Sequence, residues 1–404
     1  TTDQNTWTWE TSFDTFAGVT KSKAATSFIT VNYGTGTPSE AAGWVQYANV
    51  TKKYGYKYWE VGNECYGGWE TDTHARANDP TIYAQQFKLY YNAMKAKDPT
   101  IKVGAVANPG EDSFATYTDH PATNPRTGLQ HNGWTPVMLA TLKGEGVTPD
   151  FIIYHNYPQA GNESDFGLLQ STSGWATDIG SLRQMLTDYL GADTAAKVQI
   201  DCTENNSDAT SPGKQMCSLV NGLYLADSFG SMLQTECQSM MWWDLLNGQD
   251  TGGNNASWLY GWRQYGDYGV VDADFNPYPV FYVHKLLSVF ATSGDSVLPV
   301  TTDYGLLTAY AVARQSGTLQ LLVVNKNPTA TLSAQISLSG YIPQPDAKTY
   351  SYGIPQDNAA QTGAGSPDVA SGGISNAGPT TVLSFPPYSA TVIVFKKQSY
   401  FFPG

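Results

Sequence analysis

Apolar and polar positions alternate through the first two thirds of the chain between short β-type runs and longer helix-type stretches. The short runs are rich in β-branched or aromatic residues and end at turn residues, so they are predicted to be strands. They lie at residues 28–33, 58–64, 101–106, 151–155, 198–204 and 239–243. Helices are predicted between them, near residues 39–54, from residue 79, and near residues 136–143, 175–189 and 213–229. This repeat predicts an α/β fold with a parallel sheet.

The pattern changes at about residue 291, where short alternating strands with turn signals replace the repeat. Residues 306–312, 319–324 and 390–395 are examples, and no long helical period interrupts them. Such a segment is typical of an antiparallel β-sandwich. Residues 359–378 are rich in Gly, Ser and Ala and are predicted to form a long loop. Two domains are therefore expected, at residues 1–290 and 291–404.

Two of the predicted parallel strands end in a glutamate beside an asparagine. Asn63 and Glu64 close one strand, and Glu204 and Asn205 close another. Strand alternation puts Glu64 on one face with Tyr58, Glu60 and Gly62, and it makes Glu204 continue the apolar row of residues 198, 200 and 202. One strand-end glutamate alone is more often a solvated loop residue. However, parallel barrel strands gather their C-terminal ends on one face, and two facing carboxyls are what cleavage of a glycosidic bond requires.

The motifs resemble those of clan A retaining glycoside hydrolases, and the arabinofuranosidase family 51 is the most similar. The resemblance rests on WEVGNE at residues 59–64, HNY at 155–157 and TEN at 203–205. The lead-in VNYGTGT at 31–37 and EAAGWV at 40–45 add to it. It covers roughly residues 10–290, and an appended sandwich also fits. The resemblance implies a (β/α)8-type barrel.

The resemblance implies that Glu204 is the nucleophile, that Glu64 is the acid/base, and that Asn63 holds the 2-hydroxyl of the substrate. A retaining site needs the two carboxyls about 5 to 5.5 Å apart. Ionised Glu204 is then expected to raise the pKa of Glu64 and keep it protonated as the acid. The same pair performs both steps, so no metal and no organic cofactor is expected.

Further residues are expected to contact the sugar or the two carboxyls. The resemblance implies that His155 and Tyr157 orient or hydrogen-bond the carboxylates, and that Trp243 forms the floor of the sugar subsite. Asn205 is expected to bind substrate as part of the second glutamate motif. Trp69 lies among glycines, so it is interpreted as either a sugar platform or a core residue.

The family order makes the strand at residues 28–33 the third of eight, so the first two barrel strands are apparently missing from this chain. They should carry an arginine that supports the nucleophile. An open six-stranded barrel would expose a parallel strand edge and apolar surface. A second short polypeptide is therefore expected to complete the barrel, unless the recorded chain is incomplete. Family 79 enzymes, which resemble heparanase, complete their barrel in this way.

Composition narrows the classes of partner. The net charge is −13 and the sequence pI is near 4.7, which disfavours nucleic acid and anionic membrane surfaces. No run of about 18 apolar residues is present, so no span is expected. Only 14% of residues are charged, while 26 are Tyr and 11 are Trp, which suits a carbohydrate ligand. This balance favours a secreted or extracellular protein.

The four cysteines are too few for a disulfide framework, with Cys217 and Cys237 as a weak candidate pair.

Three functions stay open from the sequence. The first is an α-L-arabinofuranosidase that acts on plant or microbial polysaccharide. The second is an endo-β-glycanase, or a β-glucuronidase of the family 79 kind, on the same machinery. The third is a catalytically silent carbohydrate-binding protein.

Overall fold

The computed structural model describes residues 11–161 and 163–398. Contacts divide these residues into two compact units. Unit 1 comprises residues up to 155, residues 177–203 and residues 237–239, and unit 2 comprises the rest. The division crosses the strands at residues 151–156 and 199–205 and the helix at residues 174–190, so neither unit coincides with a predicted domain. The domain boundary near residue 290 stays a prediction.

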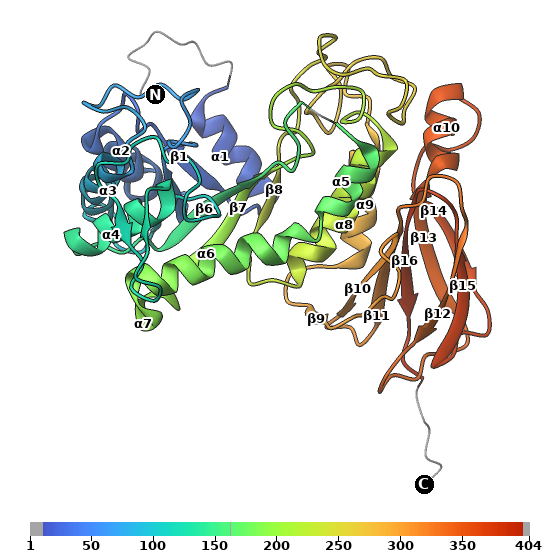
Figure 1. The fold of residues 1–404 in the computed structure, drawn as a ribbon. Helices are drawn as coiled ribbons and strands as arrows, with labels where there is room; N and C mark the ends of the chain where they lie inside the picture. Colours follow the sequence, from blue (N-terminus) through green and yellow to red (C-terminus); the bar gives the residue numbers. More distant parts are fainter. Residues whose placement is uncertain (1–10, 162, 399–404) are drawn as a thin grey trace. The chain divides into compact units, whose positions relative to one another are not determined.

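The six predicted strands of the first two thirds are all present and form one sheet (Figure 1). They are β1 (Phe28–Val31), β2 (Tyr58–Val61), β3 (Lys102–Val106), β6 (Phe151–Asn156), β7 (Gln199–Asn205) and β8 (Met240–Trp242), in the order β1-β2-β3-β6-β7-β8. The pairs β1–β2, β2–β3 and β3–β6 are parallel. The α/β class is therefore confirmed, and β1 lies at an edge of the sheet.

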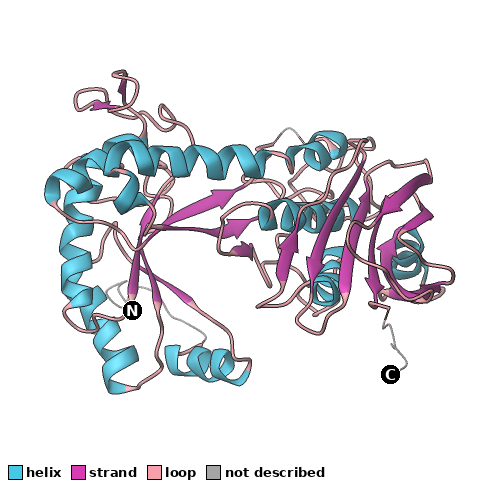
Figure 2. Cartoon of the chain, turned by 90° about the horizontal axis from the view of Figure 1, so that it is seen from below, coloured by secondary structure: helices cyan, strands magenta, loops and turns pink. Residues whose placement is uncertain are grey.

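Helices of unit 1 lie beside these strands (Figure 2). They are α1 (Phe13–Ser22), α2 (Pro38–Val45), η1 (Gln46–Thr51), α3 (Pro80–Lys95), α4 (Trp134–Glu145) and α7 (Ala192–Ala195), while α6 (Gly174–Leu190) begins in unit 2. The helix predicted at 39–54 thus changes to a π-helix after Val45. A short hairpin of β4 (Ala122–Thr123) and β5 (Gln130–His131) was not predicted.

Helix α3 shows how unit 1 positions the end of β2. Asp79 caps the helix by accepting from the backbone N–H groups of Thr81 and Ile82. The helix then buries Tyr83, whose hydroxyl donates to the Val61 carbonyl at 2.8 Å and accepts from the Val106 N–H at 2.9 Å. The last residue of β2 is therefore held by a buried side chain.

Unit 2 contains α5 (Asp165–Ser171), α8 (Leu219–Leu233) and α9 (Pro279–Phe290) together with the antiparallel strands. The strands are β9 (Ser296–Leu298), β10 (Leu307–Ala313), β11 (Leu319–Asn325), β12 (Leu332–Ser337), β13 (Ala347–Gly353), β14 (Ala370–Ile374), β15 (Thr380–Phe385) and β16 (Ser389–Phe395). Six of them form a sheet in the order β14-β13-β16-β11-β10-β9, and β12 pairs with β15. The predicted change to antiparallel strands after residue 291 is confirmed.

The prediction of a long loop over residues 359–378 is wrong. Helix α10 (Ile354–Thr362) and strand β14 occupy much of this stretch. The Gly353 N–H donates to Gln356 Oε1 at 3.0 Å, and Gly363 ends the helix in a left-handed conformation. Strand β14 has a weak strand composition but pairs with β13 through its backbone. Tertiary pairing therefore overrides local propensity here.

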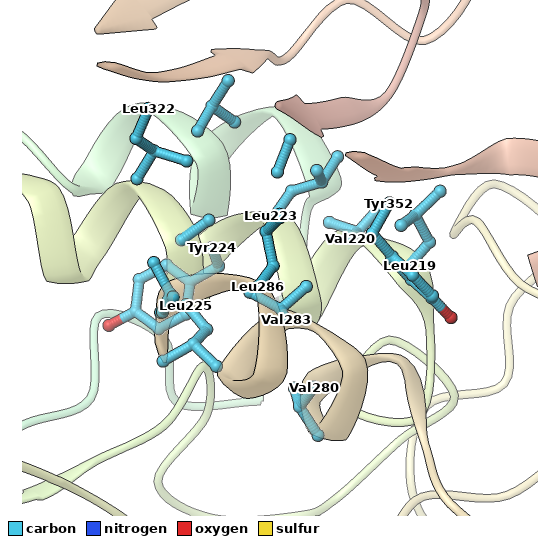
Figure 3. Packing of buried hydrophobic residues seen from close by; sticks show 14 of the residues in the cluster. Leu219, Val220, Leu223, Tyr224, Leu225, Val280, Val283, Leu286, Leu322 and Tyr352 are labelled. Atoms are coloured by element: carbon cyan, nitrogen blue, oxygen red, sulfur yellow. The ribbon is translucent and has the colours of Figure 1, made fainter. Parts of the chain in front are cut away.

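One hydrophobic core joins α8 and α9 to the antiparallel sheet within unit 2 (Figure 3). Leu223 of α8 and Leu286 of α9 are fully buried beside Leu322 of β11. Each such side chain contributes about 1.5 to 3 kcal/mol relative to an exposed one. Buried Asp227 of α8 also pairs with Lys326 at 2.9 Å. These contacts fix α8, the helix that follows Glu204 in the chain.

Cys217 is a buried thiol, so the weak prediction of a Cys217–Cys237 disulfide is wrong. Its Sγ lies 3.9 Å from the Asp267 carbonyl oxygen.

Among the described residues, no helix has both the length and the apolar character that a membrane span requires.

Candidate active site

The chain leaves β2 through a tight turn that sets the position of Glu64. Gly62 has φ +82°, and a Cβ there would lie 2.3 Å from Cys65 Sγ and 2.9 Å from Tyr33 Cβ. Glu64 has φ +37°, a conformation that glutamate adopts at a cost of about 1 to 3 kcal/mol. Glu64 therefore lies beyond the strand, and its expected place in the strand alternation is wrong. Strained residues of this kind cluster at functional sites.

Three side chains donate hydrogen bonds to the Glu64 carboxylate within unit 1. Nδ1 of His155, from the end of β6, lies 2.8 Å from Oε1. The Tyr66 hydroxyl donates to the same oxygen at 3.2 Å. The Trp69 indole N–H donates to Oε2 at 2.7 Å. The side chain of Glu64 is 18% exposed, so solvent still reaches it.

These donors set the protonation of Glu64. Burial by itself raises its pKa, but the hydrogen bond and charge of His155, with the bonds from Trp69 and Tyr66, outweigh burial and lower the pKa below its usual value. The sequence analysis expected a raised pKa from the charge of Glu204. The groups of unit 1 act in the opposite direction, because each of them stabilises the carboxylate.

The loop after Glu64 is braced by its own amide side chains. Nδ2 of Asn63, expected to hold a substrate hydroxyl, donates to Glu70 Oε1 at 2.9 Å. Nδ2 of Asn78 donates to the carbonyls of Cys65 and Gly67 at 3.0 and 2.9 Å. This bracing fixes the backbone on both sides of the acidic side chain.

A cavity of about 1120 Å³ lies along β1 in unit 1. Phe13, Phe28 and Trp44 line its apolar side. Asn63 and Trp69 line it as well, so the cavity reaches the loop that carries Glu64. Among the described residues, the edge strand β1 is thus bordered by a cavity that several aromatic side chains line.

In unit 2, Glu204 lies within β7, one residue before the strand ends. The Tyr157 hydroxyl donates to its Oε2 at 2.6 Å. Hydrogen bonds to a charged acceptor at this distance are about twice as strong as neutral ones. Tyr157 follows β6 by one residue, so its position is fixed by the strand.

Asn205 differs from its expected role as a substrate ligand. It is fully buried, and its Nδ2 donates to the Asn156 carbonyl and to the Tyr224 hydroxyl, both at 2.8 Å. The side chain thus ties β7 to β6 and α8 and has no exposed surface to offer a sugar. We therefore correct this assignment: Asn205 is a structural residue.

The neighbouring Asn206 was missed by the sequence analysis. It is fully buried, its Nδ2 donates to the Trp243 carbonyl, and its Oδ1 accepts from Asn221 Nδ2 at 3.1 Å. The Trp243 N–H donates to the Asn205 carbonyl at 3.1 Å, and the side chain of Trp243 is 43% exposed. The paired asparagines after Glu204 were the available signal, because buried amide side chains need hydrogen-bond partners.

The fold is shared with solved glycoside hydrolases. An α-L-arabinofuranosidase from Thermotoga maritima matches with a TM-score of 0.67 and 20% identity, over 95% of this chain and 78% of that one. A family 44 xyloglucanase from Paenibacillus polymyxa matches with a TM-score of 0.68 and 14% identity, over 95% and 83% of the two chains. The chain therefore has the α/β fold of this class of proteins.

At the sequence level the chain is similar to a probable α-L-arabinofuranosidase C from Aspergillus clavatus. The two are 31% identical over 106 residues, which is 22% of this chain and 20% of the relative. The match thus spans about a fifth of the length of that relative. No protein-family model matches the chain.

Proposed function

We propose that this chain is the catalytic part of a retaining glycoside hydrolase, an α-L-arabinofuranosidase, with Glu204 as nucleophile and Glu64 as acid/base. One observation carries the proposal. Glu64 lies in the turn that follows β2, Glu204 lies at the end of β7 of the same sheet, and the end of β6 supplies a donor to each glutamate. His155 donates to Glu64, and Tyr157 donates to Glu204. The carboxyl ends of parallel strands gather catalytic groups in this way.

The proposed reaction has two displacements. In the first, a carboxylate oxygen of Glu204 bonds to the anomeric carbon, the glycosidic C–O bond breaks, and the departing oxygen takes the proton of Glu64. In the second, the Glu64 carboxylate takes a proton from water, the water oxygen bonds to the anomeric carbon, and the ester to Glu204 breaks. Both carboxyls return to their starting states. Trp243, with an exposed face, is proposed to floor the sugar subsite.

The three donors on Glu64 have a consequence for the first step. They favour its carboxylate, whereas the acid must enter the reaction protonated. We infer that the negative charge of the nucleophile supplies the opposing effect, since two like charges at 5 to 5.5 Å are costly to hold together. The balance between His155 and Glu204 then sets the working pH range.

The finer architecture is also part of the proposal. The sheet is proposed to supply strands three to eight of a (β/α)8-type barrel, and the antiparallel strands to form a β-sandwich. Among the described residues β1 is the edge strand, and this position and the cavity beside it support a further polypeptide segment that pairs with β1. Denaturing intact-mass analysis of active native protein tests this. A single species of 43.8 kDa with full activity would contradict it.

A crossed substrate panel tests the activity. The protein should hydrolyse 4-nitrophenyl α-L-arabinofuranoside, and early NMR spectra should show the product with the anomeric configuration of the substrate. The second candidate is an endo-acting β-glycanase, favoured by the shared fold with the Paenibacillus xyloglucanase. It predicts a fall in polymer viscosity without turnover of the aryl arabinoside. No turnover of any substrate would leave the carbohydrate-binding alternative.

Because polysaccharides lie outside cells, we also propose that the enzyme is secreted.

A further inference from the structure

A row of hydroxyl side chains lies on one face of strands β13 and β16 in unit 2. Ser351 pairs with Thr391 across the two strands, and Thr349 pairs with Ile393. Directly paired residues point to the same side of a sheet, so these side chains share one face. Tyr352, the next residue along β13, packs instead into the core with α8 and α9 (Figure 3). The hydroxyl row therefore faces away from these helices.

The hydroxyl row faces the second antiparallel pair of strands, β12 and β15. Ile393 belongs to a hydrophobic core that includes Phe385 of β15, together with the partly buried Leu383 of the same strand. Strands that face each other in two layers normally fill the space between them with apolar side chains. Ile393 follows this rule, whereas Ser351 and Thr391 break it.

A cavity of about 250 Å³ lies at this place in unit 2, and we call it the hydroxyl cavity. Its lining includes Thr349, Ser351, Gln356 and Thr391 on the polar side and Phe385 on the apolar side. Drug-sized ligands occupy cavities of about 300 to 1,000 Å³, so the hydroxyl cavity has the size for a single sugar ring. None of the described residues that line it carries a charged side chain.

The hydroxyl groups of the row have no hydrogen-bond partner among the described residues. Thr391 is 9% exposed, and Thr349 and Ser351 are half-buried. A buried polar group without a partner costs stability, and the great majority of such groups are paired in folded proteins. Three of them at neighbouring positions indicate a polar partner in the cavity.

The rim of the hydroxyl cavity is held in place by its own hydrogen bonds. Asn325 Nδ2 donates to the carbonyls of Phe385 and Pro386 at 2.9 and 2.8 Å. Ser389 Oγ donates to the Pro386 carbonyl at 2.7 Å. Gln356 Oε1 accepts from a backbone N–H at 3.0 Å, and its Nε2 has no partner in the described part of the chain. A rim fixed in this way loses little conformational freedom when a ligand binds.

We propose that the hydroxyl cavity is a binding site for one neutral sugar ring, separate from the proposed active site. Each Ser or Thr hydroxyl both donates and accepts, as sugar hydroxyls do, and the Gln356 amide adds two donors. Leu383 and Phe385 cover the C–H surface of the ring. The uncharged lining selects against sugar acids and sugar phosphates, whose charge would be buried without a partner. The inference does not rest on the proposed function, since it uses neither Glu64 nor Glu204.

Hydrogen–deuterium exchange of the full chain locates the binding, because it reports the hydroxyl cavity and the proposed active site on separate peptides. D-Xylose, L-arabinose and D-glucuronate are the probes. A ligand of so few atoms should bind with a Kd of about 1 mM, so about 10 mM sugar nearly saturates the site. The two neutral sugars should slow exchange in residues 353–358 and 384–389, which contribute to the rim, and D-glucuronate should not.

Thr391→Val removes one hydroxyl and keeps the shape of the side chain. The Kd measured from the slowed exchange should rise about five- to tenfold, the effect of one lost hydrogen bond. The melting temperature of the sugar-free protein should stay the same or rise, because an unpaired buried hydroxyl is removed. Thr380→Val, at an exposed position of β15, is the matched control and should change neither quantity. A purely structural role of Thr391 would instead lower the melting temperature and leave the Kd unchanged.

Ser351→Ala repeats the test, so the result does not depend on how one variant folds. Slower exchange with xylotriose as well as with D-xylose would assign the cavity to the terminal ring of a glycan, and slower exchange with D-xylose alone would assign it to a free sugar. No slowing with any neutral sugar would leave water as the partner of these hydroxyls and overturn the proposal, as would a wild-type Kd in both variants. None of these results depends on turnover of an aryl arabinofuranoside, so the proposed function is tested separately.

Discussion

The Tyr157 hydroxyl donates to Oε2 of Glu204 at 2.6 Å, a charge-assisted bond between adjacent strand ends. Two residues earlier in the same segment, His155 bonds Glu64. One strand end thus supplies a neutral hydroxyl to one carboxyl and an imidazole to the other. The two donors differ in chemistry. An imidazole can itself gain a proton and a positive charge, whereas a tyrosine hydroxyl donates its hydrogen bond without a charge.

Replacement of Tyr157 by phenylalanine removes one donor from Glu204 and keeps the ring. A hydrogen bond to a charged group contributes about 1.5 to 3 kcal/mol, so kcat/KM should fall by about 10- to 100-fold. Steady-state kinetics with an aryl arabinofuranoside measures this. Tyr47→Phe, which removes an exposed hydroxyl bonded to Asp14, is the control and should have wild-type kinetics. An unchanged kcat/KM for Tyr157→Phe would show that the bond has no part in catalysis.

Substitution of Glu64 and of Glu204 should impair different steps of the reaction. Glu64→Ala should still form the glycosyl-enzyme from a 2,4-dinitrophenyl arabinofuranoside, because that leaving group needs no acid. Added azide should then speed turnover and give a glycosyl azide of retained configuration. Glu204→Ala forms no such intermediate and should give no retained azide. Glu145→Gln, a partly exposed partner of Lys88, should behave as the wild type. Retained azide from Glu204→Ala would refute the assignment.

Removal of His155 should shift the pH dependence in a defined direction. His155 lowers the pKa of Glu64, so His155→Leu should raise that pKa. Glu64 would then stay protonated at higher pH, and the basic limb of the kcat/KM profile should move upward. His155→Gln, which keeps an N–H donor without the charge, should move it less. A basic limb that moves to lower pH in His155→Leu would contradict the described contacts.

Gly62→Ala should destabilise the fold and the turn that holds Glu64. The new methyl group meets Cys65 Sγ and Tyr33 Cβ at a positive φ, with an expected loss of about 2 to 5 kcal/mol. Gly55→Ala is the matched control, because it has φ +72° but no atom within 4 Å of the added Cβ. It should lose only about 1 to 2 kcal/mol. Urea denaturation of both variants measures the difference, and equal losses would exclude the clash.

The sequence predicted the strands well because a parallel sheet covered by helices is buried on both sides. Strands such as residues 151–154 therefore have a continuous apolar signal. It also predicted that Glu204 lies at the end of a strand, which is β7, whereas Glu64 follows β2 by three residues instead of closing it. It predicted that His155 bonds a carboxylate, but it did not predict that Tyr66 and Trp69 also donate to Glu64, because tertiary structure, and not local propensity, decides those contacts. The roles of Asn205 and of residues 359–378 were missed for the same reason, since backbone partners distant in the chain decide them.

The thiol of Cys65 provides a direct measure of how often the turn that holds Glu64 opens. It is 4% exposed, it follows Glu64 directly, and burial raises its pKa well above the usual value, so it does not react while the turn is closed. Cys217 is also buried but lies in unit 2. A pulse of alkylating reagent, followed by peptide mass analysis, compares the two rates. Faster labelling of Cys65 would mean that the loop that carries Glu64 opens locally while the rest of the molecule stays folded.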